Sequence, residues 1–129
     1  MIADSTRLAP RSLRVIVVDD ERDSVATLTL LLTEEGHEVC GLQRGSEVLR
    51  AVADFRPDAV LLDIAMPDMS GYEVARKIRS RYGEVKPMLI AISGRYKQES
   101  DKLLARTVGF DHHVAKPYDP NELLALLRS

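Results

Sequence analysis

The chain has 129 residues, 29% of them charged, with a formal net charge of −2 at pH 7. This is the length of a single domain, and the small net charge gives no reason to expect nucleic acid or an anionic membrane as the main partner. No apolar run approaches the roughly 18 residues of a membrane span. The first residues lack the basic and apolar pattern of a secretory signal, so we expect none, and the single cysteine allows no internal disulfide. We therefore expect a globular, cytoplasmic protein.

The first half of the chain alternates apolar runs with helical patterns. Residues 1–12 are polar and without periodicity, so we expect a flexible N-terminal arm before a domain that spans residues 13–128. The run at 13–18 predicts a buried strand. We then expect a helix at about 23–35 that ends at Gly36, a strand at 38–42, and a helix from Ser46, as its N-cap, to Phe55.

The same alternation continues to the end of the chain. We expect strands at 59–62, 88–92 and 112–115, and helices at about 72–81, 98–107 and 119–127. Asp119 is a good N-cap for the last helix because Pro120 follows it at the first helical position. Strands that alternate with helices predict right-handed crossovers and a parallel sheet covered on both faces.

Charged and polar side chains follow the ends of four expected strands. Asp19 and Asp20 follow the first strand, Asp63 the third, Ser93 the fourth and Lys116 the fifth. The carboxyl ends of parallel strands meet at one edge of the sheet, where ligands bind. Carboxylate oxygens suit Mg²⁺, and a neighbouring lysine can offset negative charge. The set therefore favours phosphoryl transfer onto a carboxylate.

Three segments at these strand ends resemble the signature of receiver domains in two-component signalling. They are Val17–Glu21, Leu61–Pro67 and Val114–Pro117, and the resemblance covers about residues 13–128. It implies an α/β, flavodoxin-like (βα)5 sandwich with a five-stranded parallel sheet in the order 2-1-3-4-5. The segment Gly109–His113 is most similar to receivers attached to hybrid histidine kinases.

The resemblance implies a role for each residue of the metal site. Asp63 accepts the phosphoryl group and binds Mg²⁺ directly together with Asp20. Asp19 helps to hold the ion through water, and the backbone carbonyl of Ala65 is a further ligand.

The resemblance also implies residues that sense the phosphoryl group. Ser93 and Lys116 contact it, and Ser93 and His113 form the switch, with an imidazole where the family usually has Tyr or Phe. Ala65 and Arg95 flank the approach of water and tune the lifetime of the phosphorylated state. The implied partners are a sensor histidine kinase or histidine phosphotransfer protein and a downstream protein, for a monomer or weak dimer.

Three other functions are open. An Asp-nucleophile phosphatase typically needs a second Asp at the position of Ala65, and a flavodoxin-type flavin carrier needs a phosphate loop where Asp19 and Asp20 stand. A degenerate receiver that only docks a partner requires a defect that the sequence does not reveal. We expect no enzyme activity beyond self-catalysed phosphoryl acceptance and slow autodephosphorylation.

Two further features have plain structural interpretations. The basic residues of the helix at 72–81, which are Arg76, Lys77, Arg79 and Arg81, are expected to form a solvated face rather than a nucleic-acid site. Cys40 is expected to be a small core residue.

Overall fold

A computed structural model describes residues 12–94 and 99–128, with the backbone alone for 99–102. The strands are β1 (Arg14–Val18), β2 (Glu38–Leu42), β3 (Ala59–Asp63), β4 (Met88–Ser93) and β5 (His112–Ala115). The helices are α2 (Arg22–Glu34), α3 (Val48–Phe55), α4 (Gly71–Tyr82), α5 (Glu99–Val108) and α6 (Pro120–Arg128), with a 3-10 turn η1 (Gly45–Glu47) before α3. The predicted arm lies outside the described residues except for Ser12, and the predicted domain limits stay a prediction.

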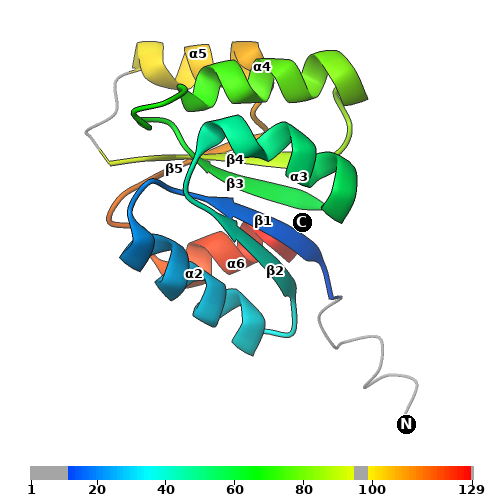
Figure 1. The fold of residues 1–129 in the computed structure, drawn as a ribbon. Helices are drawn as coiled ribbons and strands as arrows, with labels where there is room; N and C mark the ends of the chain where they lie inside the picture. The colour runs from blue at the N-terminus through cyan, green and yellow to red at the C-terminus, as the bar shows by residue number, and fades with distance from the viewer. Residues whose placement is uncertain (1–11, 95–98, 129) are drawn as a thin grey trace, which may run out of the picture.

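The five strands form one parallel sheet in the order β2-β1-β3-β4-β5. Helices α3, α4 and α5 cover one face of the sheet, and α2 and α6 cover the other (Figure 1). The flavodoxin-like fold and its strand order are thus confirmed. Because all strands run the same way, their carboxyl ends share one edge. None of the described helices is long and apolar enough to cross a membrane.

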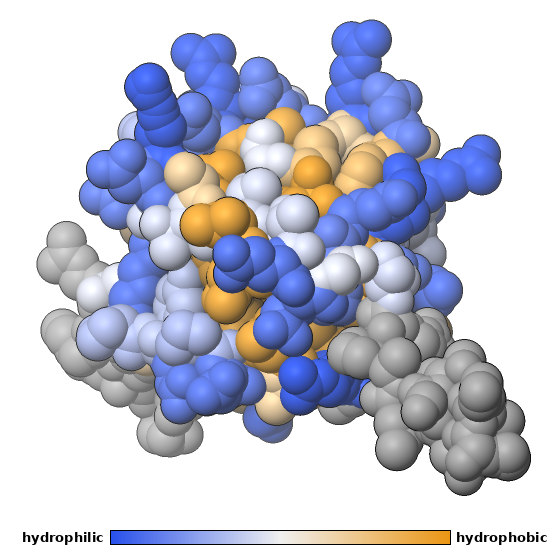
Figure 2. Space-filling model, turned by 90° about the horizontal axis from the view of Figure 1, so that it is seen from below, coloured by the Kyte–Doolittle hydropathy of each residue, from blue (hydrophilic) through white to orange (hydrophobic). Residues whose placement is uncertain are grey.

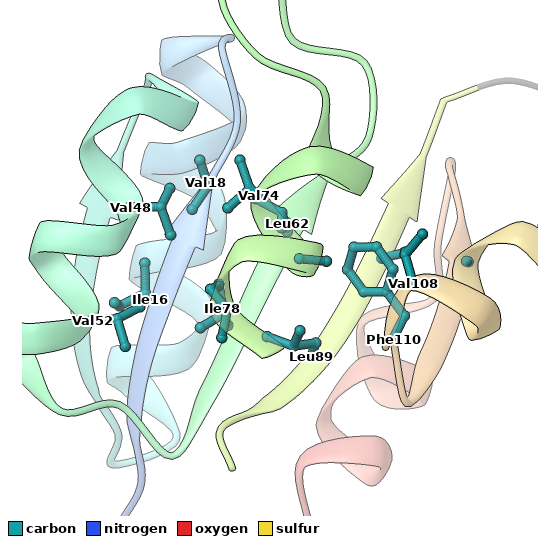
Figure 3. Close-up of a cluster of buried hydrophobic side chains, with 14 of the residues drawn as sticks. Ile16, Val18, Val48, Val52, Leu62, Val74, Ile78, Leu89, Val108 and Phe110 are labelled. Atoms are coloured by element: carbon teal, nitrogen blue, oxygen red, sulfur yellow. The ribbon is translucent and has the colours of Figure 1, made fainter. Parts of the chain in front are cut away.

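Alternate residues of each strand supply two separate cores. In β1, Ile16 and Val18 pack toward α3 and α4, while Val15 and Val17 pack toward α2 and α6. The first core continues to Phe110 beside α5 (Figure 3). On the α2 and α6 face, apolar surface remains visible between charged side chains (Figure 2). A sheet buried on both sides holds its strand ends in fixed positions.

Two helix boundaries follow from local signals that the sequence contains. Gly36, after α2, has a φ of 97°, a left-handed conformation that glycine adopts at little cost. Asp119 caps α6, since its Oδ1 accepts a hydrogen bond of 2.9 Å from the backbone N–H of Asn121. Both predictions are confirmed.

The predicted cap of α3 is wrong. Ser46 lies inside η1, and Glu47 occupies the N-cap position of α3 without a side-chain cap. The backbone N–H groups of Gly45 and Ser46 instead donate to the carboxylate of Asp68, which comes from the loop after β3. A carboxylate distant in sequence thus caps the start of η1.

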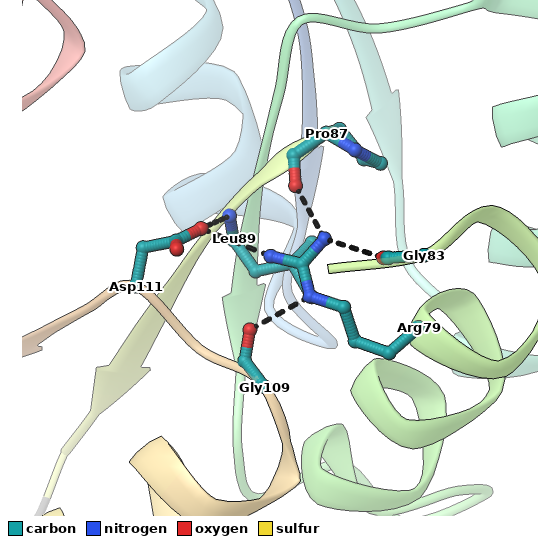
Figure 4. A network of polar contacts seen from close by, with 6 residues as sticks. All are labelled: Arg79, Gly83, Pro87, Leu89, Gly109 and Asp111. Atoms are coloured by element: carbon teal, nitrogen blue, oxygen red, sulfur yellow. Dashed lines mark hydrogen bonds and ion pairs between the residues drawn. The ribbon is translucent and has the colours of Figure 1, made fainter. Parts of the chain in front are cut away.

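The predicted solvated face of α4 is wrong for Arg79. Its side chain is only 8% exposed, while the other three basic residues of the helix are exposed. Its guanidinium donates to the carbonyls of Gly109 and Pro87 and to the Asp111 carboxylate, each at 2.9 Å (Figure 4). Cys40 is partly buried against the core, as expected.

Candidate functional site

Three carboxylates meet at the carboxyl edge of the sheet. Asp19 and Asp20 follow β1, and Asp63 is the last residue of β3. Each offers one oxygen, and these oxygens all lie within 4.8 Å of one another. Asp19 and Asp63 are buried, at 3% and 5% exposure, while Asp20 is exposed. The cluster therefore combines two desolvated carboxylates with one that faces solvent.

Short hydrogen bonds fix two of these carboxylates. Lys116, which follows β5, donates from Nζ to Oδ2 of Asp19 at 3.0 Å. The other oxygen of Asp19, Oδ1, accepts from the backbone N–H of Glu21 at 2.9 Å. Oδ1 of Asp63 accepts from the backbone N–H of Ala65 at 3.1 Å. The sheet thus brings together four residues that the sequence placed at three separate strand ends.

A glycine lets α4 begin directly against the end of β3. A Cβ atom on Gly71 would lie 2.5 Å from the carbonyl oxygen of Asp63, which is closer than real Cβ contacts. The Gly71 N–H donates to the carbonyl of Ile64 at 2.9 Å and closes the base of the loop between them. Any larger residue would displace the backbone that holds the Asp63 carboxylate. This contact with the end of β3 explains why residue 71 is a glycine.

The electrostatics of the cluster favour a bound cation. Burial, followed by the charge of Asp19, raises the pKa of Asp63 to about 6. Burial opposes the charge of Lys116, but the hydrogen bond that Lys116 donates to Asp19 and the charges of Asp19 and Asp63 outweigh it and raise the pKa of Lys116. The single positive charge of Lys116 does not balance three carboxylates, which therefore still repel one another. An oxygen-rich, undercompensated cluster is suited to a hard divalent metal ion.

We expect Asp63→Asn to stabilise the metal-free protein at pH 7. The pKa of Asp63 rises from its usual value of 3.8 to about 6 on folding, so the stability that protonation gives is present below pH 4 and lost as the pH rises through 6. The variant should therefore gain about 2–3 kcal/mol in urea unfolding with EDTA at pH 7, and almost nothing near pH 4. A variant no more stable than wild type at pH 7 contradicts this account.

Ser93 and His113 lie where the sequence placed them. Ser93 ends β4, and its carbonyl accepts from the backbone N–H of Lys116 at 2.7 Å. His113 pairs with Ala91 in the sheet and stands two residues before the partner of Ser93. Side chains alternate along a strand, so Ser93 and His113 occupy the same face, toward α5. Arg95 lies outside the described residues.

A cavity of about 420 Å³ opens beside Lys116 at the same edge. Its lining combines residues of the site with side chains from α2, β4 and the segment between β5 and α6: Asp19, Ser24, Leu28, Ile92, Gly94, Lys116, Pro117 and Tyr118. The buried Asp19–Lys116 pair can therefore be approached from solvent.

Proteins of known sequence match most of the chain. It is 39% identical over 115 residues to the transcriptional regulatory protein KdpE of Mycobacterium tuberculosis (strain CDC 1551 / Oshkosh), covering 89% of this chain and 49% of that protein. It is 38% identical over 116 residues to the DNA-binding response regulator MtrA of Mycolicibacterium smegmatis, covering 90% and 49%. The chain thus spans about half the length of the curated relatives it matches.

Solved structures match the fold over nearly its whole length. The chemotaxis protein CheY4 of Vibrio cholerae has a TM-score of 0.83 and 25% identity, and the match covers 91% of this chain and 97% of that one. A CheY-like response regulator receiver domain protein of Methanospirillum hungatei JF-1 has a TM-score of 0.81 and 26% identity, with 91% of each chain covered.

The sequence family agrees with the fold and with the clustered strand-end residues. The family model described as the response regulator receiver domain matches residues 15–128. That range contains all five strands except Arg14, the first residue of β1, and it contains the whole acidic cluster. The chain belongs to the family of response regulator receiver domains of two-component signalling.

Proposed function

We propose that Asp63 accepts a phosphoryl group in a Mg²⁺-dependent reaction and that the phosphorylated domain then changes a protein-binding surface. The observation that carries the proposal is the clustering of three carboxylate oxygens within 4.8 Å, beside a lysine bonded to one of them. The test is Mg²⁺-dependent uptake of one phosphoryl group from acetyl phosphate, followed by intact-protein mass. A wild-type protein that gains no phosphoryl mass would overturn the proposal.

The two oxygens of Asp63 have different surroundings. Oδ1 accepts the N–H of Ala65, so Oδ2 is the oxygen that we propose attacks the phosphorus. A new O–P bond then forms as the bond between phosphorus and the donor breaks, and the bonding pair leaves with the donor. With its pKa at about 6, the carboxyl of Asp63 is mostly ionised at pH 7 and can act as the nucleophile.

The other residues offset the charge that this step brings into the site. We propose that Asp20 and Asp63 hold Mg²⁺, with Asp19 through water and the Ala65 carbonyl as a further ligand. The ion supplies positive charge next to the phosphoryl oxygens. Lys116 lies against Asp19, and we propose that its flexible side chain would place the ammonium group next to a phosphoryl oxygen.

Two alternatives are less well supported. The position where an Asp-nucleophile phosphatase has its acid is Ala65, which has no proton to give. A docking module that is never phosphorylated does not need a buried carboxylate cluster, because such a cluster costs stability. Uptake of phosphate by the wild type separates the leading proposal from the docking module.

We propose a histidine kinase or histidine phosphotransfer protein as the donor and a protein as the downstream partner of a monomer or weak dimer. Relatives twice as long are named as DNA-binding regulators. The 129-residue chain has a formal net charge of −2 at pH 7, and we propose that it does not itself bind nucleic acid.

We propose that Ser93 and His113 pass the signal to the surface of α5, β5 and α6. Ser93 and Lys116 lead into these elements, and Leu103 and Leu104 of α5 are 64% and 44% exposed. A phosphoryl group that draws Ser93 inward would shift a two-state equilibrium of this surface. Backbone NMR shifts on adding beryllofluoride with Mg²⁺ should concentrate there, and shifts confined to α2 would contradict the proposal.

We expect the phosphorylated state to decay slowly and Ala65→Asn to accelerate the decay several-fold. Hydrolysis needs a water placed in line with phosphorus, and the exposed methyl of Ala65 cannot orient one. An amide at this position can. The measurement is loss of phosphoryl mass with time after removal of acetyl phosphate, with Asp54→Asn as a distant surface control. A variant that decays at the wild-type rate contradicts a role for Ala65 in the lifetime.

A further inference from the structure

We propose that Asp68 is a positioning residue for the acceptor site, because its carboxylate ties the loop after Asp63 to the turn before α3. The loop comprises residues 64–70 and carries Ala65, whose N–H holds the Asp63 carboxylate. The inference rests on the proposed function for its consequence, but the contact itself can be tested without it.

Both oxygens of the Asp68 carboxylate are engaged across the two loops. Oδ1 accepts from the backbone N–H of Gly45 at 3.2 Å, and Oδ2 accepts from that of Ser46 at 3.0 Å. These N–H groups begin η1 and lead into α3, where backbone donors have no partner within the helix. The hydrogen bond from Ser46, and then that from Gly45, hold the pKa of Asp68 below its usual value, so its carboxylate is charged at neutral pH. We call this pair of hydrogen bonds the Asp68 clamp.

Apolar packing holds the same two segments together. Met66 is buried, at 7% exposure, and Gly45 lies against it. A Cβ atom on Gly45 would lie 3.2 Å from Cε of Met66 and 3.1 Å from Cβ of Met69. The turn and the loop are therefore in close contact, and the Asp68 hydrogen bonds fix their relative position along this contact.

The loop is thus held at two points. Its base is closed by the bond from the Gly71 N–H to the Ile64 carbonyl, and its far end by Asp68. Ala65 lies between these points. Its N–H donates to the Asp63 carboxylate, and its carbonyl is the proposed metal ligand. Without the Asp68 clamp the far end is held only by its apolar contacts with Gly45, so the position of Ala65 is less well fixed. Mutating a residue that orients a metal ligand typically lowers metal affinity, although the ligand itself is unchanged.

The test compares the Mg²⁺ dependence of phosphoryl uptake in Asp68→Ala, Asp68→Asn and wild type. We expect Asp68→Ala to raise the Mg²⁺ concentration for half-maximal uptake roughly tenfold, with a smaller change in the rate at saturating Mg²⁺. Asp68→Asn should lie between them, because its amide oxygen can accept one of the two N–H groups. Asp54→Ala is the matched control, since Asp54 is exposed and its ion pair is with Arg50 of its own helix.

A second readout separates this inference from the proposed function and from unfolding. In metal-free protein, the NMR signal of the Ala65 amide should shift in Asp68→Ala and not in Asp54→Ala, whether or not the protein takes up phosphate. Far-UV circular dichroism establishes that the variants are folded, and Asp68→Asn serves if the alanine variant is not. An unchanged Ala65 amide, or a Mg²⁺ midpoint equal to that of wild type, would overturn the positioning role.

Discussion

Asp63→Asn is expected to take up no phosphoryl group from acetyl phosphate at saturating Mg²⁺, whereas wild type gains one. Asparagine keeps the size of the side chain and an oxygen that can accept from Ala65. Its amide nitrogen, however, replaces the nucleophilic Oδ2. The loss should be complete because the attacking oxygen itself is removed, and intact-protein mass measures it directly.

Two companion measurements make this result specific. Asp20→Asn should also lower uptake, because it removes an exposed ligand of the acidic cluster, and the loss should be partly recovered at higher Mg²⁺. Phosphate on wild type should be released by hydroxylamine, which cleaves acyl phosphates. Equal uptake by Asp63→Asn and wild type would show that the acceptor is another residue.

The sequence predicts the candidate site because the site depends on topology. Alternating apolar runs and helical patterns predict a parallel sheet, and a parallel sheet places the residues after each strand at one edge. Asp19 and Lys116 are 97 residues apart, and the parallel arrangement alone places both at the same edge. Their hydrogen bond is less predictable, because β3 and β4 lie between β1 and β5 and the long side chain of Lys116 has to reach across to Asp19.

The sequence does not predict contacts that join loops through single side chains. Ser46 matches the local rule for an N-cap, but it lies inside η1, and the distant carboxylate of Asp68 accepts from the backbone N–H groups of Gly45 and Ser46. Arg79 shares its spacing with exposed basic neighbours, and only the position of Gly109 and Pro87 around it reveals that it is buried. The contacts of Asp68 and Arg79 leave weak signals in the sequence because their partners lie on other elements, distant along the chain.

Arg79→Met is expected to lower the free energy of unfolding by about 2–3 kcal/mol, which is a large part of the stability of a small domain. The guanidinium bonds the carbonyls of Gly109 and Pro87 and the carboxylate of Asp111, and so joins the end of α4 to the start of β4 and the segment before β5 (Figure 4). Methionine keeps much of the apolar stem but no donor, so polar groups around it lose their partner.

Arg76→Met is the matched control on the same helix, because Arg76 is exposed and has no ion pair among the described residues. It should change the unfolding free energy by less than about 0.5 kcal/mol. The Arg79 contacts lie at the amino ends of the strands, so folded Arg79→Met should still take up phosphate from acetyl phosphate. Urea unfolding of both variants decides the question. If both variants unfold at the same urea concentration, the Arg79 hydrogen bonds only replace bonds to water and do not stabilise the fold.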